Sequence, residues 1–247
     1  MNQEIRYVST PDGPVGVVLT HPNGPGPFPV ILMFHDGPGL REANWTNARR
    51  LAIYGYCVVM PDRYHRFGDF LFVDPAKMRG AAADDPNVLE FRRMFGGTTD
   101  EHVRTDVDAI LAWLPSVEVA SSGPMGVIGY CIGARAVVRT MAEHNDRFAA
   151  GVCLHPSFCS TEEADSPHLS VPALSGQLYV GIGHEDKMQS IEMNQPFLDA
   201  VVDAGGSVDL FVGADHGFAV PGGAYHDRSA DQAYRQAVSL FNHRLQP

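Results

Sequence analysis

The stretch VIGYCIGARA, residues 127–136, places one cysteine between two glycines at the point where an apolar run meets a segment of helical character. Its central part, GYCIG, fits the pattern glycine–x–nucleophile–x–glycine of the nucleophile elbow, a tight turn from a buried strand into a helix. Side chains two residues to either side of the nucleophile would collide in such a turn, so glycines are expected there. The alternative is a buried structural cysteine between packing glycines, and the short pattern alone does not decide between the two.

Short apolar runs alternate with helical segments on both sides of this stretch. Runs of four to eight apolar residues are typical of strands buried on both faces, and their alternation with helices predicts a mostly parallel sheet covered on both faces. The predicted strands are 15–20, 29–34, 56–61, 125–130, 149–155, 176–183 and 207–213, and the predicted helices are 41–54, 100–114, 132–143 and 230–245.

The domain organisation is expected to be simple. No repeat or Ser/Gly-rich linker divides the 247 residues, which favours a single α/β domain over residues 1–247. One long segment, residues 62–97, is irregular and carries several arginines, so we expect a lid or a substrate-binding excursion, with an ordinary surface loop as the alternative.

Composition excludes some partners. A net charge of −11 disfavours nucleic acid and anionic membranes, because both would be repelled. The first residues lack the pattern of a signal peptide, and no apolar run approaches the ~18 residues of a membrane span. Four sparse cysteines without CxxC spacing favour a reduced, cytoplasmic protein.

The elbow assigns roles to Cys131 and its neighbours in space. Cys131 would lie at the N-terminus of the next helix, whose dipole favours a thiolate, and the backbone N–H of Ile132 would face a developing oxyanion. The loop FHDGPG follows the first central strand, where a second oxyanion donor is built, and Gly37 N–H is the candidate. Asp36 would direct a carboxylate into the same space, or else cap the next helix.

A nucleophilic thiol needs a base and a group that orients the base, and two later loops offer both. HEDK follows the strand at 176–183, and ADHGF follows the strand at 207–213. Both loops open on the same edge of the sheet as the elbow, since the carboxyl ends of parallel strands share one edge. The chain order cysteine, acid, histidine therefore favours a catalytic function for Cys131, one carboxylate of the HEDK loop, and His216.

The motifs GYCIG, GHEDKM and ADHGFA together resemble the dienelactone hydrolase family of α/β-hydrolases, and RRLAIYGYCVVMPDRY resembles the passage that follows the family's oxyanion loop. The resemblance implies the α/β-hydrolase fold and a cysteine acyl-enzyme mechanism on small lactones or esters, with no metal or organic cofactor. It makes Cys131 the nucleophile, His216 the base and then acid, and Asp186 its orienter. It also gives Asp36 the place of a family glutamate that accepts the thiol proton at rest.

One departure concerns the substrate. Members that cleave dienelactone have an arginine four residues after the histidine, where this chain has Val220. A second substrate-binding arginine of those members comes from the excursion, for which this chain offers Arg66, Arg79, Arg92 and Arg93. Dienelactone is therefore in question as the substrate, whereas ester or lactone hydrolysis is expected.

Three other interpretations are weaker. HDGPG also resembles the HGGPG loop of proline iminopeptidases, which would make the chain a relative of serine peptidases that act on amides. A non-catalytic binding protein of the same fold is a further alternative. A metal hydrolase lacks HxxxH or HxH ligand spacing among its candidate ligands, which are His35, Asp36, His65, His155, His184 and His216. Nothing in the sequence predicts the oligomeric state.

Overall fold

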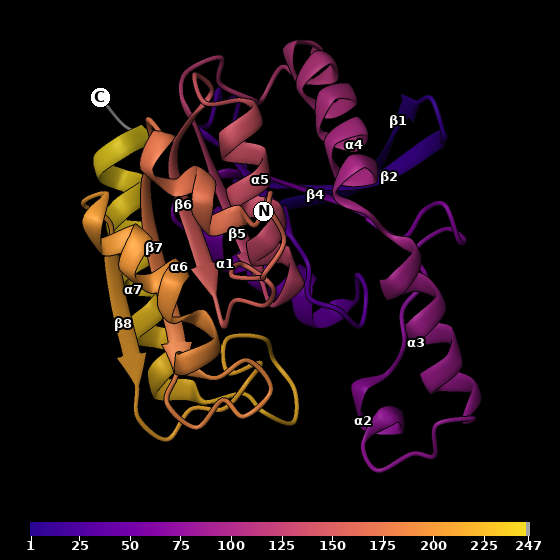
Figure 1. The fold of residues 1–247 in the computed structure, drawn as a ribbon. Coiled ribbons are helices and arrows are strands. Elements are labelled where there is room, and N and C mark those ends of the chain that lie inside the picture. Colours follow the sequence, from indigo (N-terminus) through magenta and orange to yellow (C-terminus); the bar gives the residue numbers. More distant parts are fainter. Residues whose placement is uncertain (246–247) are drawn as a thin grey trace.

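In the computed structural model, which describes residues 1–245, eight strands form one sheet in the order β1-β2-β4-β3-β5-β6-β7-β8 (Figure 1). The pairs β1–β2 and β2–β4 are antiparallel, and all other neighbours are parallel, which confirms the predicted mostly parallel sheet. The strands are β1 (Asn2–Thr10), β2 (Gly13–His21), β3 (Val30–Phe34), β4 (Cys57–Pro61), β5 (Met125–Tyr130), β6 (Phe148–Leu154), β7 (Gln177–Gly183) and β8 (Ser207–Phe211).

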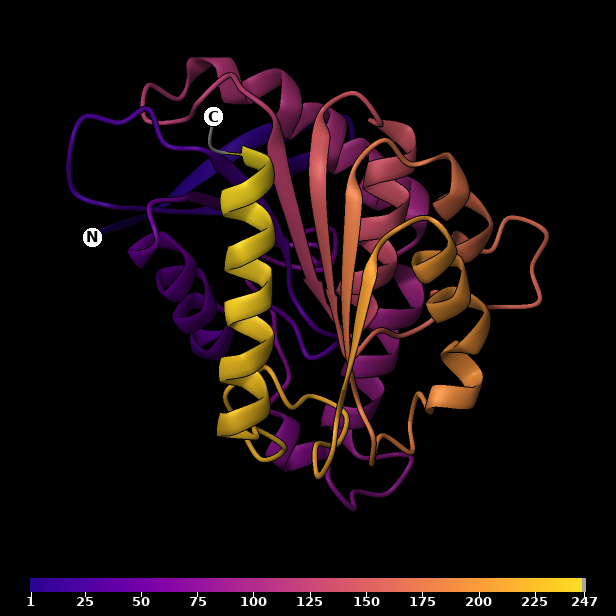
Figure 2. The same ribbon diagram turned by 90° about the vertical axis from the view of Figure 1, so that its left-hand side faces the viewer.

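Helices cover both faces of the sheet, as Figure 2 shows with the sheet seen nearly edge-on. Helices α1 and α7 pack on one face, and α4, α5 and α6 pack on the other, so the core divides into two apolar clusters with the sheet between them. These helices are α1 (Glu42–Ile53), α4 (Asp100–Trp113), α5 (Ile132–Glu143), α6 (Ile191–Asp203) and α7 (Asp227–Leu245). Burial on both faces explains why β3, β4 and β5 are continuous apolar runs.

The two outer strands differ from the central ones. Strand β1 is largely exposed and pairs with β2 in a hairpin that extends the sheet, and it is an addition to the predicted set of strands. Strand β8 at the opposite edge is only partly buried, with Leu210 half exposed. In the described part of the chain, no helix is both long and apolar enough to cross a bilayer.

Residues 62–97 are more regular than expected, because they contain α2 (Pro75–Met78) and α3 (Pro86–Gly97). In each helix an aspartate caps the N-terminus and proline follows at the first helical position, as Asp85 and Pro86 do for α3. A small apolar cluster around Tyr64 and Met94 holds α3 against the body. In Figure 1 this segment extends at the lower right, beyond the sheet.

Candidate active site

The elbow has the backbone that the sequence pattern requires. Cys131 joins β5 to α5 with φ +55° and ψ −119°, a left-handed conformation that is strained for a residue with a side chain. A Cβ on Gly129 would lie 2.1 Å from the carbonyl oxygen of Gly133, and a Cβ on Gly133 would lie 2.6 Å from the Phe34 oxygen. The two glycines are therefore steric requirements of the turn and of its contact with β3.

His216 and Asp186 meet at the same edge of the sheet, in the loops after β8 and β7. His216 Nδ1 donates to Asp186 Oδ2 at 2.7 Å, and the backbone N–H groups of Met188 and Gln189 donate to the other carboxylate oxygen. The Asp186 side chain has no solvent exposure. This arrangement fixes the tautomer that leaves Nε2 free for chemistry. That nitrogen is buried, makes no hydrogen bond of good geometry to the described residues, and interacts with Cys131.

Electrostatics favour a charged pair between the thiol and the imidazole. Burial would raise the pKa of Cys131, but its interactions with His216 and with the Ser157 hydroxyl hold the pKa below that of an ordinary thiol. Burial would lower the pKa of His216, but its hydrogen bond to Asp186 and the interaction with Cys131 raise it to about 10. A thiolate facing an imidazolium is the protonation state that these interactions stabilise.

The two predicted oxyanion donors also lie at this edge. Neither the N–H of Ile132 nor that of Gly37 donates to another described residue. Gly37 is held in place because the Tyr64 hydroxyl donates to its carbonyl oxygen at 2.7 Å. A Cβ on Gly37 would press on Phe91 and Phe95 of α3 at 3.3–3.4 Å. Helix α3 therefore packs directly over the loop that carries the second donor.

Asp36 has other partners than the thiol. Arg41 donates to its two carboxylate oxygens at 2.6 and 2.9 Å, and Asn44 Nδ2 donates at 3.0 Å. Burial would raise the pKa of Asp36, but Arg41 holds it below the ordinary value. The hydrogen bonds of the described residues include none between Asp36 and Cys131, so its acceptance of the thiol proton stays a prediction.

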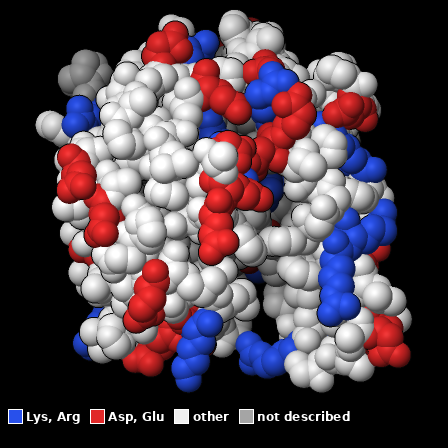
Figure 3. Space-filling model, viewed as in Figure 1, with Lys and Arg blue, Asp and Glu red and all other residues white. Residues whose placement is uncertain are grey.

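A cavity of about 460 Å³ adjoins the elbow. It lies between the α3–α4 junction, the start of α5 and the loop after β6, and Figure 3 shows a hollow beside the α3 segment on this face. Its lining includes Ile132, the rings of Phe95 and Phe158, and five charged side chains, which are Arg63, Arg135, Asp100, Glu101 and Glu163. Arg63 is 6% exposed, and its Nε and Nη1 have no acceptor among the described residues. An unpaired buried guanidinium is a strong donor toward an anion.

The four arginines named from the sequence have other surroundings. Arg66 pairs with Asp12 and Asp106, Arg93 pairs with Glu90, and Arg92 donates to a backbone carbonyl. Arg79 packs against Gly223. None of these arginines lines the cavity beside Ile132.

The histidines do not form a metal site. Within residues 1–245, no three His, Cys, Asp or Glu side chains are grouped so that they could hold a metal ion. Burial lowers the pKa of His35 to about 3, and its Nδ1 hydrogen-bonds to the Asp36 carbonyl at 2.7 Å, which is a structural environment. His155 is also fully buried, and its ring meets that of His216 edge to face at 5.1 Å.

Two site residues were not anticipated. Ser157 Oγ lies 3.3 Å from Cys131 Sγ, and Arg63 lines the adjoining cavity. Both follow the carboxyl ends of predicted strands, β6 and β4, and therefore share the edge of the sheet with the elbow. That position was a usable signal, although neither residue belongs to a motif.

Comparison with known proteins identifies relatives along nearly the whole chain. A model of the dienelactone hydrolase family matches residues 15–245. A protein of Escherichia coli O157:H7, provisionally named a carboxymethylenebutenolidase, is 26% identical over 225 residues, covering 87% of this chain and 77% of that protein. Hydrolase pyvD of Aspergillus violaceofuscus is 27% identical over 241 residues, covering 94% and 88%.

Solved structures share the architecture. A provisionally assigned dienelactone hydrolase from Klebsiella pneumoniae superposes with a TM-score of 0.79 at 21% identity, covering 98% of this chain and 99% of that one. A dienelactone hydrolase-like promiscuous phosphotriesterase from metagenomic libraries superposes with a TM-score of 0.73 at 19% identity, covering 99% of both chains. At these identities the likeness establishes the fold alone, and it confirms the predicted α/β-hydrolase fold.

Proposed function

Because the chain belongs to the dienelactone hydrolase family, as the sequence motifs predicted, we propose that it hydrolyses a small carboxylic ester or lactone through an acyl-enzyme on Cys131. One observation carries this proposal: a cysteine in the strained elbow conformation faces a histidine that is oriented by a buried carboxylate. The three groups come from the loops after β5, β8 and β7, at one edge of the sheet.

The proposed reaction has two halves. In the first, the Cys131 sulfur attacks the carbonyl carbon, the C–S bond forms, and the N–H groups of Ile132 and Gly37 stabilise the oxyanion. The C–O bond then breaks, and the alkoxide takes the proton that His216 Nε2 holds. In the second half, water gives a proton to His216 and attacks the thioester, the C–S bond breaks, and the acid leaves. Asp186 holds the imidazole and stabilises its charged form throughout.

Arg63 and the apolar side chains of the cavity support a substrate with a carboxylate and an apolar part, although Asp100, Glu101 and Glu163 also line the cavity. Arg63 offers unpaired guanidinium donors to a carboxylate, although it does not occupy either arginine position expected from the family. Phe95 and Phe158, whose ring centroids are 6.2 Å apart, offer an apolar wall. Residues 62–97 contribute Arg63 and Phe95 and thereby form the substrate-binding excursion of a single domain that spans residues 1–247. The four free cysteines support a reducing compartment such as the cytoplasm.

The test combines labelling with a substrate panel. Lactones, aryl esters and carboxylate-bearing esters are offered to the purified protein, and iodoacetamide is expected to label Cys131 and abolish hydrolysis. Cys131→Ala is expected to be inactive. Cys57→Ala is the control that keeps activity, because Cys57 is buried in β4 and burial raises the pKa of its thiol to about 12. Hydrolysis that persists in Cys131→Ala would remove the proposed mechanism.

A further inference from the structure

We propose that the resting protein already holds Cys131 as a thiolate, and that the hydroxyl of Ser157 is a catalytic residue that donates a hydrogen bond to this sulfur. The inference rests on the proposed function of Cys131 and deepens it, because it assigns the group that prepares the nucleophile. It also differs from the sequence expectation, in which Asp36 accepts the thiol proton.

Backbone contacts fix Ser157 beside the elbow. The N–H of Ser157 donates to the Cys131 carbonyl at 3.1 Å, and the N–H of Cys131 donates to the Leu154 carbonyl at 3.1 Å. The loop after β6, which carries Ser157, has an unusual backbone, since His155 and Phe158 have φ of +41° and +56°. Non-glycine residues in this region are strained, and such strain concentrates at functional sites. The fold therefore maintains a loop whose shape brings the hydroxyl to the thiol.

The hydroxyl proton has one destination. Ser157 is 1% exposed, and its Oγ has no polar partner other than Cys131 Sγ, at 3.3 Å, among the described residues. A buried O–H group without an acceptor is costly, so this group donates to sulfur. Donation to an ionised acceptor is stronger than donation to a neutral one, which means that the hydroxyl favours the thiolate over the thiol.

The carboxylate that could compete for the thiol proton is already engaged. Arg41 and Asn44 donate three hydrogen bonds to Asp36. If Asp36 took up the thiol proton, the largely buried guanidinium of Arg41 would lose its counter-charge. The thiol proton instead moves from Sγ to His216 Nε2, which gives a thiolate and an imidazolium with no net change in charge.

The other groups around the sulfur do not reverse this state. The negative charge of Asp36 opposes the thiolate, and the interactions with His216 and Ser157 outweigh it. Burial keeps the remaining titratable neighbours in their neutral forms. It lowers the pKa of His155 and raises the pKa values of Tyr64 and Cys159.

The experiment measures the ionisation of the thiol without any substrate. The rate of alkylation of Cys131 by iodoacetamide is followed against pH by mass spectrometry on the full chain. The other three thiols are not expected to be alkylated, because burial raises the pKa values of Cys57, Cys153 and Cys159. We expect a midpoint below the ~8.5 of a free thiol. In Ser157→Ala the midpoint should rise by about 1–2 pH units, which is the effect of losing one hydrogen bond to a charged group.

Ser166→Ala is the matched control. Ser166 is a buried serine that, like Ser157, lies between β6 and β7, but its hydroxyl hydrogen-bonds to Thr161 and His168 instead of the thiol. The alkylation midpoint of Ser166→Ala should therefore equal that of the wild type. A wild-type midpoint near that of a free thiol would overturn the proposal whether or not the variants fold. An unchanged midpoint in a folded Ser157→Ala would overturn it as well.

The two proposals can fail separately. A low midpoint that depends on Ser157, in a protein that hydrolyses none of the esters or lactones, supports this inference and removes the proposed function. Hydrolysis that requires Cys131, together with a midpoint near that of a free thiol, supports the proposed function and removes this inference.

Discussion

At the scale of single residues, the charge on His216 depends on one carboxylate. The bond from Nδ1 to Asp186 and the contact with Cys131 raise the pKa of His216 to about 10 against the effect of burial. The imidazolium is therefore retained through neutral pH and is lost only as the pH rises through this value. The thiolate that we propose is paired with this imidazolium only at pH values above the pKa of Cys131 and below that of His216.

Asp186→Asn is expected to narrow the pH range over which His216 is charged. Without the carboxylate charge, burial lowers the pKa of His216, so the imidazolium is lost at a lower pH and the alkaline side of the activity profile moves down. His216→Ala should reduce kcat/KM by ~10²–10⁴, as the loss of a general base does. Both profiles are measured on the best ester of the panel. An alkaline limb that stays in place in Asp186→Asn would contradict the role of Asp186.

Arg63 is expected to set substrate preference at the same scale. Arg63→Met should raise KM for a carboxylate-bearing ester by about 10–100-fold, the effect of one hydrogen bond between charged groups, and leave a neutral aryl ester nearly unchanged. Arg66→Met is the matched control, since Arg66 is paired with Asp12 and Asp106 away from the cavity. Equal losses on both esters would show that Arg63 is structural.

The sequence predicted the residues that belong to motifs and missed those that do not. Cys131, Asp186 and His216 could be named because strand ends and glycines mark their loops. The partner of Asp36 could not be named, because Arg41 lies five residues away at the N-cap of α1 and only the turn at Gly39 brings the two together. Ser157 and Arg63 lie at strand ends but have no flanking pattern.

At the scale of elements, the ion pair between Asp36 and Arg41 joins the loop after β3 to the start of α1. Both side chains are largely buried, at 10% and 13% exposure. Arg41 holds the pKa of Asp36 below the value in an unfolded chain, so the pair adds stability at neutral pH that is lost as the pH falls through the folded pKa.

Arg41→Ala is expected to destabilise the fold by about 3–5 kcal/mol at neutral pH, because it leaves a buried carboxylate without its partner. The difference from the wild type should shrink in acid, where Asp36 is protonated in the variant. Urea unfolding at both pH values measures this. Arg6→Ala is the control, since Arg6 forms an exposed pair with Glu4 and should change stability by less than about 1 kcal/mol.

Elements with a buried face were the predictable ones. Strands β3 to β7 are apolar because helices cover them, and α4 and α5 carry apolar residues at helical spacing. Strand β1 and helix α3 lack such faces. Strand β1 is held by its ladder with β2, and α3 has one fully buried residue, Met94, so neither leaves a strong apolar pattern in the sequence.

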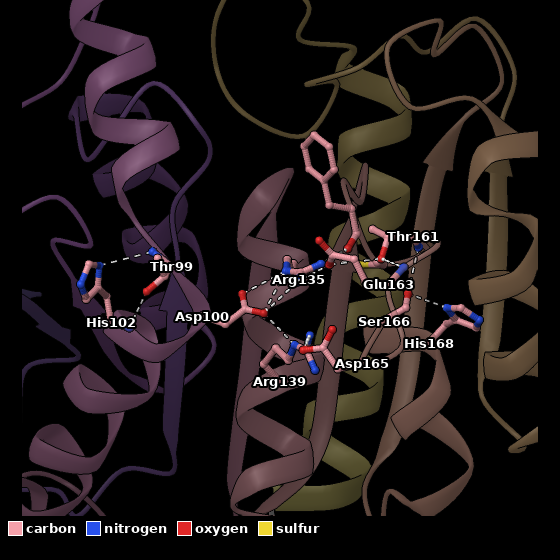
Figure 4. Close-up of polar contacts among 12 residues, drawn as sticks. Thr99, Asp100, His102, Arg135, Arg139, Thr161, Glu163, Asp165, Ser166 and His168 are labelled. Carbon is pink, nitrogen blue, oxygen red and sulfur yellow. Dashed lines mark hydrogen bonds and ion pairs between the residues drawn. The ribbon is translucent and has the colours of Figure 1, made fainter.

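At the scale of the whole molecule, one charge cluster joins three parts of the chain beside the cavity. Asp100 at the start of α4 accepts hydrogen bonds from Arg135 and Arg139 of α5, and these arginines also pair with Glu163 and Asp165 of the loop after β6 (Figure 4). Arg135 further donates to the Phe158 carbonyl, so the cluster supports the wall of the cavity.

Asp100→Asn is expected to lower Tm by about 2–4 °C, the shift that a loss on the order of 1 kcal/mol gives in a chain of this size. The difference should decrease as salt is added, because partly exposed pairs are screened. Thermal unfolding at low and high salt measures it. Glu90→Gln, which weakens the exposed pair with Arg93 within α3, is the control with little effect.

The overall architecture was predictable because parallel sheets obey strong rules. Alternating strands and helices with short connections leave few arrangements, and the observed sheet is one of them. The shape of the cavity was not predictable, because it depends on how α3 packs over Gly37.

The order of the site residues along the chain has a consequence for protein synthesis. Cys131 leaves the ribosome well before Asp186, and His216 leaves last. Until the loop after β8 has been made, the growing chain holds Cys131 without His216, and its thiol ionises like that of an ordinary cysteine. The thiolate that we propose can therefore form only when the last strand has joined the sheet.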